Sequence, residues 1–237
     1  MMTLAKSTGR FLWPLLLGCF PLEVNGESAQ VLDLERMKGL RSFAEAALQH
    51  GRDTYGKKHS PLFVDSLEVS TMKAPEKMYI HRLGGPGPRS KQPFQPVISS
   101  NLAYQGNLMR FLVGISNLTG DARFEEAYKE SLRYCFRHYA VPNGLLQMGH
   151  HRWVNLNTDD QDGNDWPAGK SGHEMKRDYP YYPLFWETDP VAARRMMTAH
   201  WDSHIQDWGF MNFTRHGSYV KEVNEETVWN QPITDPV

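Results

Sequence analysis

The chain has 237 residues, a hydrophobic content of 40% and a formal net charge of −1. This composition is typical of a globular protein, and the balanced charge gives no electrostatic basis for binding nucleic acid or an anionic membrane. The only two cysteines, Cys19 and Cys135, exclude a disulfide framework, so the fold must depend on a hydrophobic core.

The first 26 residues have the features of a signal peptide. Lys6 and Arg10 supply positive charge, residues 11–20 form a short apolar segment, and cleavage is expected before Glu27. The apolar segment is too short to span a bilayer. An alternative is a lipoprotein signal that leaves Cys19 lipidated; in either case the mature protein is exported, to the periplasm or the medium.

Four amphipathic helices are predicted from apolar side chains spaced three and four residues apart. The first runs from about Val31 to His50, and the second follows the cap at Ser99-Ser100. The third begins at Asp121 after a turn of a few residues, which predicts an antiparallel helix hairpin. Cys135 lies on the apolar face of this third helix, as expected for a buried thiol.

The fourth helix is expected to begin at Asp189-Pro190, where Asp189 is the N-cap and Pro190 occupies the first turn. It is predicted to continue to Trp208 and to stop at Gly209. Its inner face is predicted to carry Met197, Trp201, His204, Ile205 and Trp208.

Long aromatic and polar connectors separate these helices, and the longest is Gly149–Pro190. Residues 145–148 and 151–156 are predicted to pair as a short β-ribbon. Helix pairs that alternate tight turns with long loops are typical of α/α toroids. We therefore predict a mainly all-α fold, an incomplete α/α toroid over residues 27–237, and expect these residues to be an N-terminal part of a longer catalytic domain.

Three segments of the chain, residues 50–63, 162–182 and 212–219, carry a family resemblance. They read HGRDTYGKKHSPLF, DGNDWPAGKSGHEMKRDYPYY and NFTRHGSY. They resemble secreted pectate-lyase-like proteins of the α/α-toroid polysaccharide lyases, and the resemblance covers most of the mature chain. It implies a helical toroid that acts on an acidic polysaccharide, but it carries no catalytic residue over by position.

A lyase of this kind neutralises a uronate carboxylate, removes the C5 proton and protonates the leaving oxygen. Arg, His, Asn or Ca²⁺ suits the first task, and Tyr, His, Lys or Arg suits the proton transfers. One connector holds several such groups. The predicted catalytic residues are Tyr219, His216, Arg215 and His173; the simpler alternative is solvated loop residues and a packed tyrosine ring.

Further polar and aromatic residues are predicted to bind the sugar chain, although rings of this kind also pack in helical cores. They are Asn212, Trp153, Trp166, Tyr181, Tyr182 and Arg177.

An acidic run could hold Ca²⁺ through Asp160, Asp162 and Asp165, although its spacing does not fit an EF-hand and a solvated acidic turn is the simpler interpretation. His200 and His204 lie four residues apart on one helix face, where both could bind a metal ion. Trp201 stands where zinc proteases have a glutamate, so histidines of the core are the simpler interpretation.

The leading functional hypothesis is an exported lyase that cleaves a uronic-acid-containing polysaccharide by β-elimination. The enzyme alternative is a glycoside hydrolase on a similar toroid, with Asp160, Asp165 and Glu174 as candidate carboxylates. The alternative without catalysis is an exported glycan-binding protein. No membrane-spanning segment and no nucleic-acid partner are expected.

Overall fold

The computed structural model describes residues 26–75, 98–149, 152–163, 172–174 and 181–223. Residues 1–38 and 39–237 form two compact units, and the predicted signal peptide lies outside the described residues, except for its last residue, Gly26. No helix in the described ranges has the length and apolar character needed to cross a membrane.

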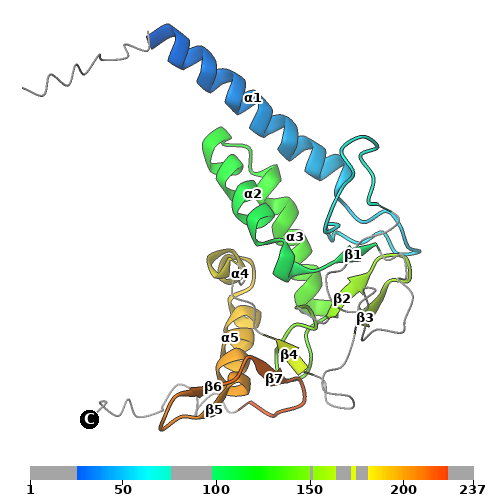
Figure 1. Cartoon of the computed structure of the whole chain (residues 1–237), viewed down its shortest axis with the longest axis vertical. Helices are drawn as coiled ribbons and strands as arrows, with labels where there is room; N and C mark the ends of the chain where they lie inside the picture. The colour runs from blue at the N-terminus through cyan, green and yellow to red at the C-terminus, as the bar shows by residue number, and fades with distance from the viewer. Residues whose placement is uncertain (1–25, 76–97, 150–151, 164–171, 175–180, 224–237) are drawn as a thin grey trace, which may run out of the picture. The chain divides into compact units, whose positions relative to one another are not determined.

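The described part of the chain is mainly helical, which confirms the predicted fold class (Figure 1). The toroidal arrangement of the helix pairs stays a prediction. The α-helices are α1 (Gly26–His50), α2 (Gly106–Thr119), α3 (Arg123–His138), α4 (Tyr182–Thr188) and α5 (Pro190–His204), with a 3₁₀ turn, η1, at Leu102–Tyr104.

The predicted helix hairpin is formed by α2 and α3. Gly120 ends α2 in the left-handed conformation, with φ 71°, and its N–H donates to the carbonyl of Ser116 at 2.8 Å. The start of α2 differs from the prediction, because Ser99-Ser100 is strand β1 and not a helix cap. Asn101 instead caps η1, accepting a hydrogen bond from the backbone of Ala103 at 3.1 Å.

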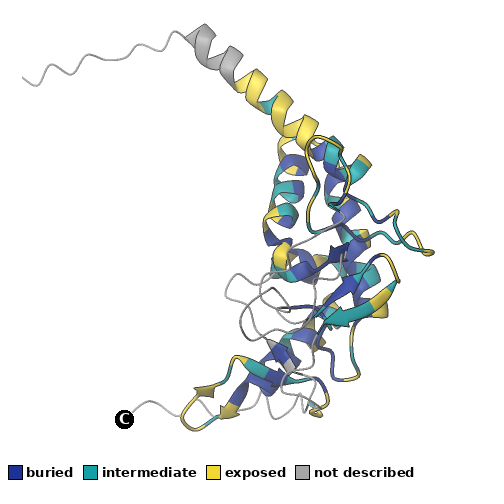
Figure 2. Ribbon diagram, turned by 45° about the vertical axis from the view of Figure 1, so that its right-hand side comes forward, coloured by how far each residue is buried: buried dark blue, intermediate teal, exposed yellow. Residues whose placement is uncertain are grey.

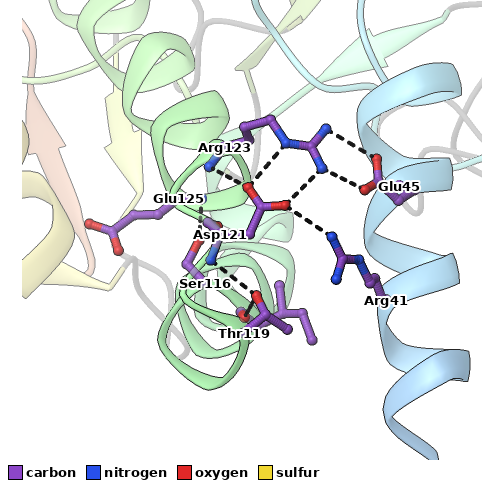
Figure 3. A network of polar contacts seen from close by, with 8 residues as sticks. Arg41, Glu45, Ser116, Thr119, Asp121, Arg123 and Glu125 are labelled. Atoms are coloured by element: carbon purple, nitrogen blue, oxygen red, sulfur yellow. Dashed lines mark hydrogen bonds and ion pairs between the residues drawn. The ribbon is translucent and has the colours of Figure 1, made fainter. Parts of the chain in front are cut away.

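A polar network connects the turn of this hairpin to the C-terminal half of α1 (Figure 3). The Arg123 guanidinium contacts the carboxylates of Asp121 and Glu45, each at 2.7 Å, and Arg41 contacts Asp121 at 3.4 Å. Most of these groups are exposed, so each pair contributes little stability and mainly fixes geometry.

The described residues also form three small antiparallel sheets. The first has the order β1 (Ser99–Ser100), β2 (Arg152–Asn155) and β3 (Asp160–Gly163). The second pairs β4 (Gly172–Glu174) with β7 (His216–Ser218), and the third pairs β5 (Ile205–Asp207) with β6 (Asn212–Phe213).

The predicted ribbon partner of residues 151–156 was wrong. β2 pairs with β3 and β1, and residues 145–148 form only an isolated bridge, between Leu146 and Ala140. Asp159 reverses the chain between β2 and β3 with φ 62°, and its carboxylate accepts the backbone N–H groups of Lys57 and Lys58 at 2.9 and 3.0 Å. The acidic run was predicted as a solvated acidic turn, whereas Asp160–Gly163 form strand β3 directly after the turn at Asp159.

Helix α5 starts as predicted but ends earlier. The Asp189 carboxylate accepts the N–H of Ala192 at 2.9 Å, which is the expected N-cap. The helix stops at His204 instead of Trp208, because Ile205 becomes extended and pairs with Phe213 in the β5–β6 hairpin.

The buried face of α5 also differs by one residue from the prediction. Met196 and His200 are buried, whereas Met197 is only half-buried and Trp201 is exposed. His204 and Ile205 are buried as predicted. The strands of the β5–β6 hairpin are largely exposed beyond this face (Figure 2).

The core is built from rings and aliphatic side chains of the helices and of the segments between them. Phe63 stacks on Tyr128 with centroids 5.4 Å apart, and Phe136 meets Phe185 edge to face at 5.6 Å. Cys135 is fully buried, as predicted, and burial raises the pKa of its thiol. A smaller cluster of Leu145, Ala199 and Tyr219 connects this core to the end of β7.

Candidate active site

The β4–β7 sheet joins the two connectors that carry the predicted catalytic residues. Its register places His173 opposite Gly217 and Glu174 opposite His216. Opposite residues in an antiparallel pair have neighbouring Cα atoms, so two segments distant in sequence become one surface. Arg215 precedes β7 and Tyr219 follows it. The structure thus brings the predicted catalytic set together.

The predicted catalytic residues form an outer pair and an inner pair. Arg215 is exposed, and His216 is half-buried with its Nε2 atom inside the protein. His173 and Tyr219 are only 0% and 4% exposed. The outer pair can meet a polymer at the surface, whereas the inner pair lies beneath it.

The inner pair packs ring against ring beside a cation from β2. The rings of His173 and Tyr219 are nearly perpendicular, with centroids 5.7 Å apart, and the Arg152 guanidinium lies 5.6 Å from the Tyr219 ring centroid. Burial raises the pKa of Tyr219 and Arg152 opposes this effect. Tyr219 is therefore protonated near neutral pH.

Two further histidines complete the inner layer. His200 and His204 lie one turn apart in the last turns of α5, and we call His173, His200 and His204 the histidine cluster. His173 Nδ1 lies 2.8 Å from His204 Nε2, and His200 Nε2 lies 3.3 Å from His173 Nε2. The described part of the chain contains no group of three or more His, Cys, Asp or Glu side chains arranged to hold a metal ion.

The histidine cluster is neutral near neutral pH because it is shielded from water. Burial, followed by the neighbouring His204, lowers the pKa of His200 to about 3. Burial and then His200 and His204 lower the pKa of His173 well below its usual value. The pKa of His204 is also lowered by burial and by His216, although the Thr214 carbonyl opposes the shift.

The predicted sugar-binding residues are spread over several elements. Tyr182 lies near the histidine cluster, its hydroxyl 3.4 Å from His200 Nδ1, and Tyr181 lies beneath the Arg110 guanidinium at 5.6 Å. Asn212 is exposed on β6, while Trp153 is buried on β2, so stacking on a sugar would require its neighbours to move. Trp166 and Arg177 lie outside the described residues.

The acidic run is also only partly described. Asp160 is exposed on β3, and the Asp162 carboxylate accepts a hydrogen bond from Asn155 Nδ2 at 3.1 Å. Asp165 lies outside the described ranges. A Ca²⁺ site in this run stays a prediction.

The sequence indicated which residue types form the site, but it did not show that His173 contacts His200 and His204. The spacing of His200 and His204 indicated one helix face, and burial of both confirms the interpretation as core histidines. Their contact with His173 depends on the β4–β7 pairing, which no sequence pattern announces. Arg152 was missed because its partner, the Tyr219 ring, comes from a distant segment.

Comparisons with known proteins indicate the family to which the chain is similar. Residues 60–236 match the family model described as periplasmic pectate lyase. A pectate disaccharide-lyase of Dickeya dadantii (strain 3937) is 32% identical over 125 residues, which make up 52% of this chain. The chain covers 22% of the length of that relative.

Proposed function

Because the family model matches about three quarters of the chain, residues 60–236, the chain belongs to the periplasmic pectate lyase family, and from this premise we propose that it cleaves pectate by β-elimination. The family description as periplasmic also supports the exported location. The observation that carries the proposal is the β4–β7 pairing, which gathers the predicted catalytic residues in an outer and an inner layer.

The reaction breaks the C5–H bond and the C4–O glycosidic bond of a galacturonate and forms a C4–C5 double bond. The C5 proton passes to a base, and the departing oxygen receives a proton. Neutralising the neighbouring carboxylate lowers the cost of the carbanion-like charge that develops at C5. The site must therefore supply a cation at the carboxylate, a group that accepts the C5 proton, and a donor for the departing oxygen, either a protonated side chain or water.

Arg215 and His216 are the residues of the set that can meet this substrate. A guanidinium presents a planar fork that matches a carboxylate, and Arg215 is exposed directly before β7. His216 follows it and is half-buried. We assign carboxylate neutralisation and C5 proton removal to this pair, with Arg215 as the group nearest the substrate.

The inner pair supports these groups and does not contact the substrate. His173 has both ring nitrogens within hydrogen-bond distance of other histidines. Tyr219 is packed with Leu145 and Ala199. We therefore propose that His173 and Tyr219 support the site as part of its frame, in place of the direct catalytic roles predicted for them.

The test is incubation of the protein with pectate, alginate and glucuronan, followed by the ultraviolet absorbance of the unsaturated product. We expect absorbance to rise with pectate, and Arg215→Ala to reduce the rate by roughly 100-fold or more, as for loss of a group that stabilises developing charge. Arg215→Lys keeps the charge without the planar fork and should retain part of the rate.

The matched control is Arg137→Ala, which removes an exposed arginine from the last turn of α3. Reducing ends that appear without unsaturation would indicate hydrolysis instead. Binding of pectate without any cleavage would indicate a glycan-binding protein.

A further inference from the structure

The backbone directly before Arg215 is fastened to the end of α5 at two points. The N–H of Thr214 donates to the His204 carbonyl at 2.8 Å. The carbonyl of Thr214 lies 2.7 Å from Nδ1 of the His204 ring. Both backbone polar groups of Thr214 are thus held by His204, and the next residue along the chain is Arg215.

The Thr214 carbonyl fixes the tautomer of His204. A carbonyl oxygen can only accept a hydrogen bond, so His204 Nδ1 must carry the proton. In a neutral imidazole the other nitrogen is then an acceptor. His204 Nε2 therefore accepts, and His173 Nδ1, at 2.8 Å, must be the donor.

The same reasoning gives the tautomers of His173 and His200. With its proton on Nδ1, neutral His173 accepts at Nε2, so His200 donates from Nε2 at 3.3 Å. His200 Nδ1 is then an acceptor for the Tyr182 hydroxyl at 3.4 Å. Burial raises the pKa of Tyr182 to about 12, so its hydroxyl keeps the proton that it donates.

The hydrogen bonds therefore all run in one direction, from Tyr182 through His200, His173 and His204 to the Thr214 carbonyl. We infer that the histidine cluster is a positioning device: a chain of neutral imidazoles in fixed tautomers that orients the peptide before Arg215. His204 is its principal positioning residue because, of the three histidines in the cluster, it is the one that bonds the Thr214 backbone. The inference rests on the proposed function, in which Arg215 meets the substrate.

Close packing around His204 supports this role. A Cβ atom on Gly217 would come within 2.8 Å of His204 Nε2 and 2.9 Å of Ser203 Cβ, so only glycine lets β7 lie this close to α5. The Phe213 ring stacks on the His204 imidazole with centroids 5.8 Å apart. The ring is thus held from the strand side and from the hairpin side.

Stability alone does not explain three buried imidazoles. Burying polar rings costs free energy that their hydrogen bonds only offset, and well-packed apolar residues of similar volume often stabilise a core as well or better. A polar chain is directional, however, and each bond fixes the orientation of the next ring. Fixed orientation is useful where a backbone carbonyl beside an exposed reactive group must be held in place.

The first test needs no activity. Long-range ¹H–¹⁵N spectra of the protein labelled in its histidines report which ring nitrogen carries the proton, and single His→Gln variants assign the signals. We expect Nδ1–H tautomers for His173 and His204 and an Nε2–H tautomer for His200. Any other combination would overturn the chain, whether or not the protein cleaves pectate.

The second test compares His204→Asn with His204→Leu. The asparagine amide can reach the position of Nδ1 and donate to the Thr214 carbonyl, whereas leucine cannot. We expect His204→Leu to lower kcat by roughly 10- to 100-fold with little change in KM, and His204→Asn to recover a large part of kcat.

The control for the second test is His138→Asn, which replaces an exposed histidine at the end of α3. Equal kcat values for wild type and a folded His204→Leu protein would refute the positioning role. If His204→Leu does not fold, the tautomers measured in the wild-type protein decide the question. Wild-type protein that shows the expected tautomers but cleaves no pectate would instead refute the proposed function.

Discussion

The burial of His200 predicts that the folded protein loses stability as the pH falls below about 7. The unfolded chain binds a proton at this residue with the ordinary pKa of 6.5, whereas burial lowers the pKa of the folded state to about 3. Between these values the unfolded state holds more protons than the folded state. Stability is therefore complete above the unfolded pKa and declines as the pH falls toward the folded pKa.

The size of the effect follows from these two pKa values. Lowering the pH from 8 to 5 is expected to cost about 2 kcal/mol through His200 alone, with a slope of about 1 kcal/mol per pH unit near pH 5.5. That is a large fraction of the stability of an ordinary domain.

The assay is urea unfolding of the wild type and of His200→Gln at several pH values between 5 and 8. Asp65 works against His200 in this window, because burial raises the pKa of its carboxyl to about 7. The quantity to follow is therefore the difference in unfolding free energy between the two proteins, in which other groups cancel. His138→Gln, at an exposed position of α3, controls for the loss of one imidazole.

We expect this difference to increase in favour of the wild type as the pH rises from 5 to about 7 and to stay constant above. Parallel stability curves for wild type and His200→Gln would refute the reasoning. They would mean that His200 is protonated equally in the folded and unfolded states, so that water or an anion reaches its ring.

Two further predictions concern the contact of β7 with His204 and the buried carboxyl of Asp65. Gly217→Ala should destabilise the fold by about 1–3 kcal/mol and abolish most pectate cleavage, because its methyl group would displace β7 from His204. The control is Gly114→Ala on α2, which has open space at its Cβ and should stabilise the protein slightly. Thermal unfolding and pectate cleavage, measured on both variants, distinguish the two outcomes. Asp65→Asn should gain stability relative to wild type as the pH rises from about 4 to 8, since the buried carboxyl of the folded wild type then loses its proton. Urea unfolding at both pH values measures this; an equal difference in unfolding free energy between the two proteins at about pH 4 and pH 8 would contradict it.

The helical frame was largely predictable because local signals determine it. Gly120 ends α2, Asp189 caps α5, and the short turn between α2 and α3 leaves a hairpin as the direct solution. The C-terminus of α5 was not predictable in this way. The apolar spacing continues through Ile205 and Trp208, and the helix yields only because Ile205 finds a strand partner in Phe213.

The residue types of the catalytic candidates could be predicted from the sequence, but their burial and their positions relative to one another could not. Arg215, His216 and Tyr219 are neighbours in sequence, so their common location required no fold. His173 joined them on residue type alone, and its place beneath them depends on the register with Gly217. Burial was the property that sequence could not supply: it separates Arg215, which is exposed, from Tyr219, which is packed in the core.

The two layers of the site have different physical requirements, and this explains why they come from different kinds of segment. Arg215 must remain exposed to meet a polymer, and it lies on the connector directly before β7. The bonds from His204 to Thr214 hold the backbone beside it from the end of a helix. The last carbonyls of a helix have no hydrogen-bond partner within the helix. The His204 carbonyl is one of them, and it accepts a hydrogen bond from the Thr214 N–H. The His204 imidazole donates from Nδ1 to the Thr214 carbonyl. To continue the series of hydrogen bonds inward to His173, the side chain at position 204 needs a donor on one edge and an acceptor on the other. Among common residues, histidine best combines these two groups with a rigid ring.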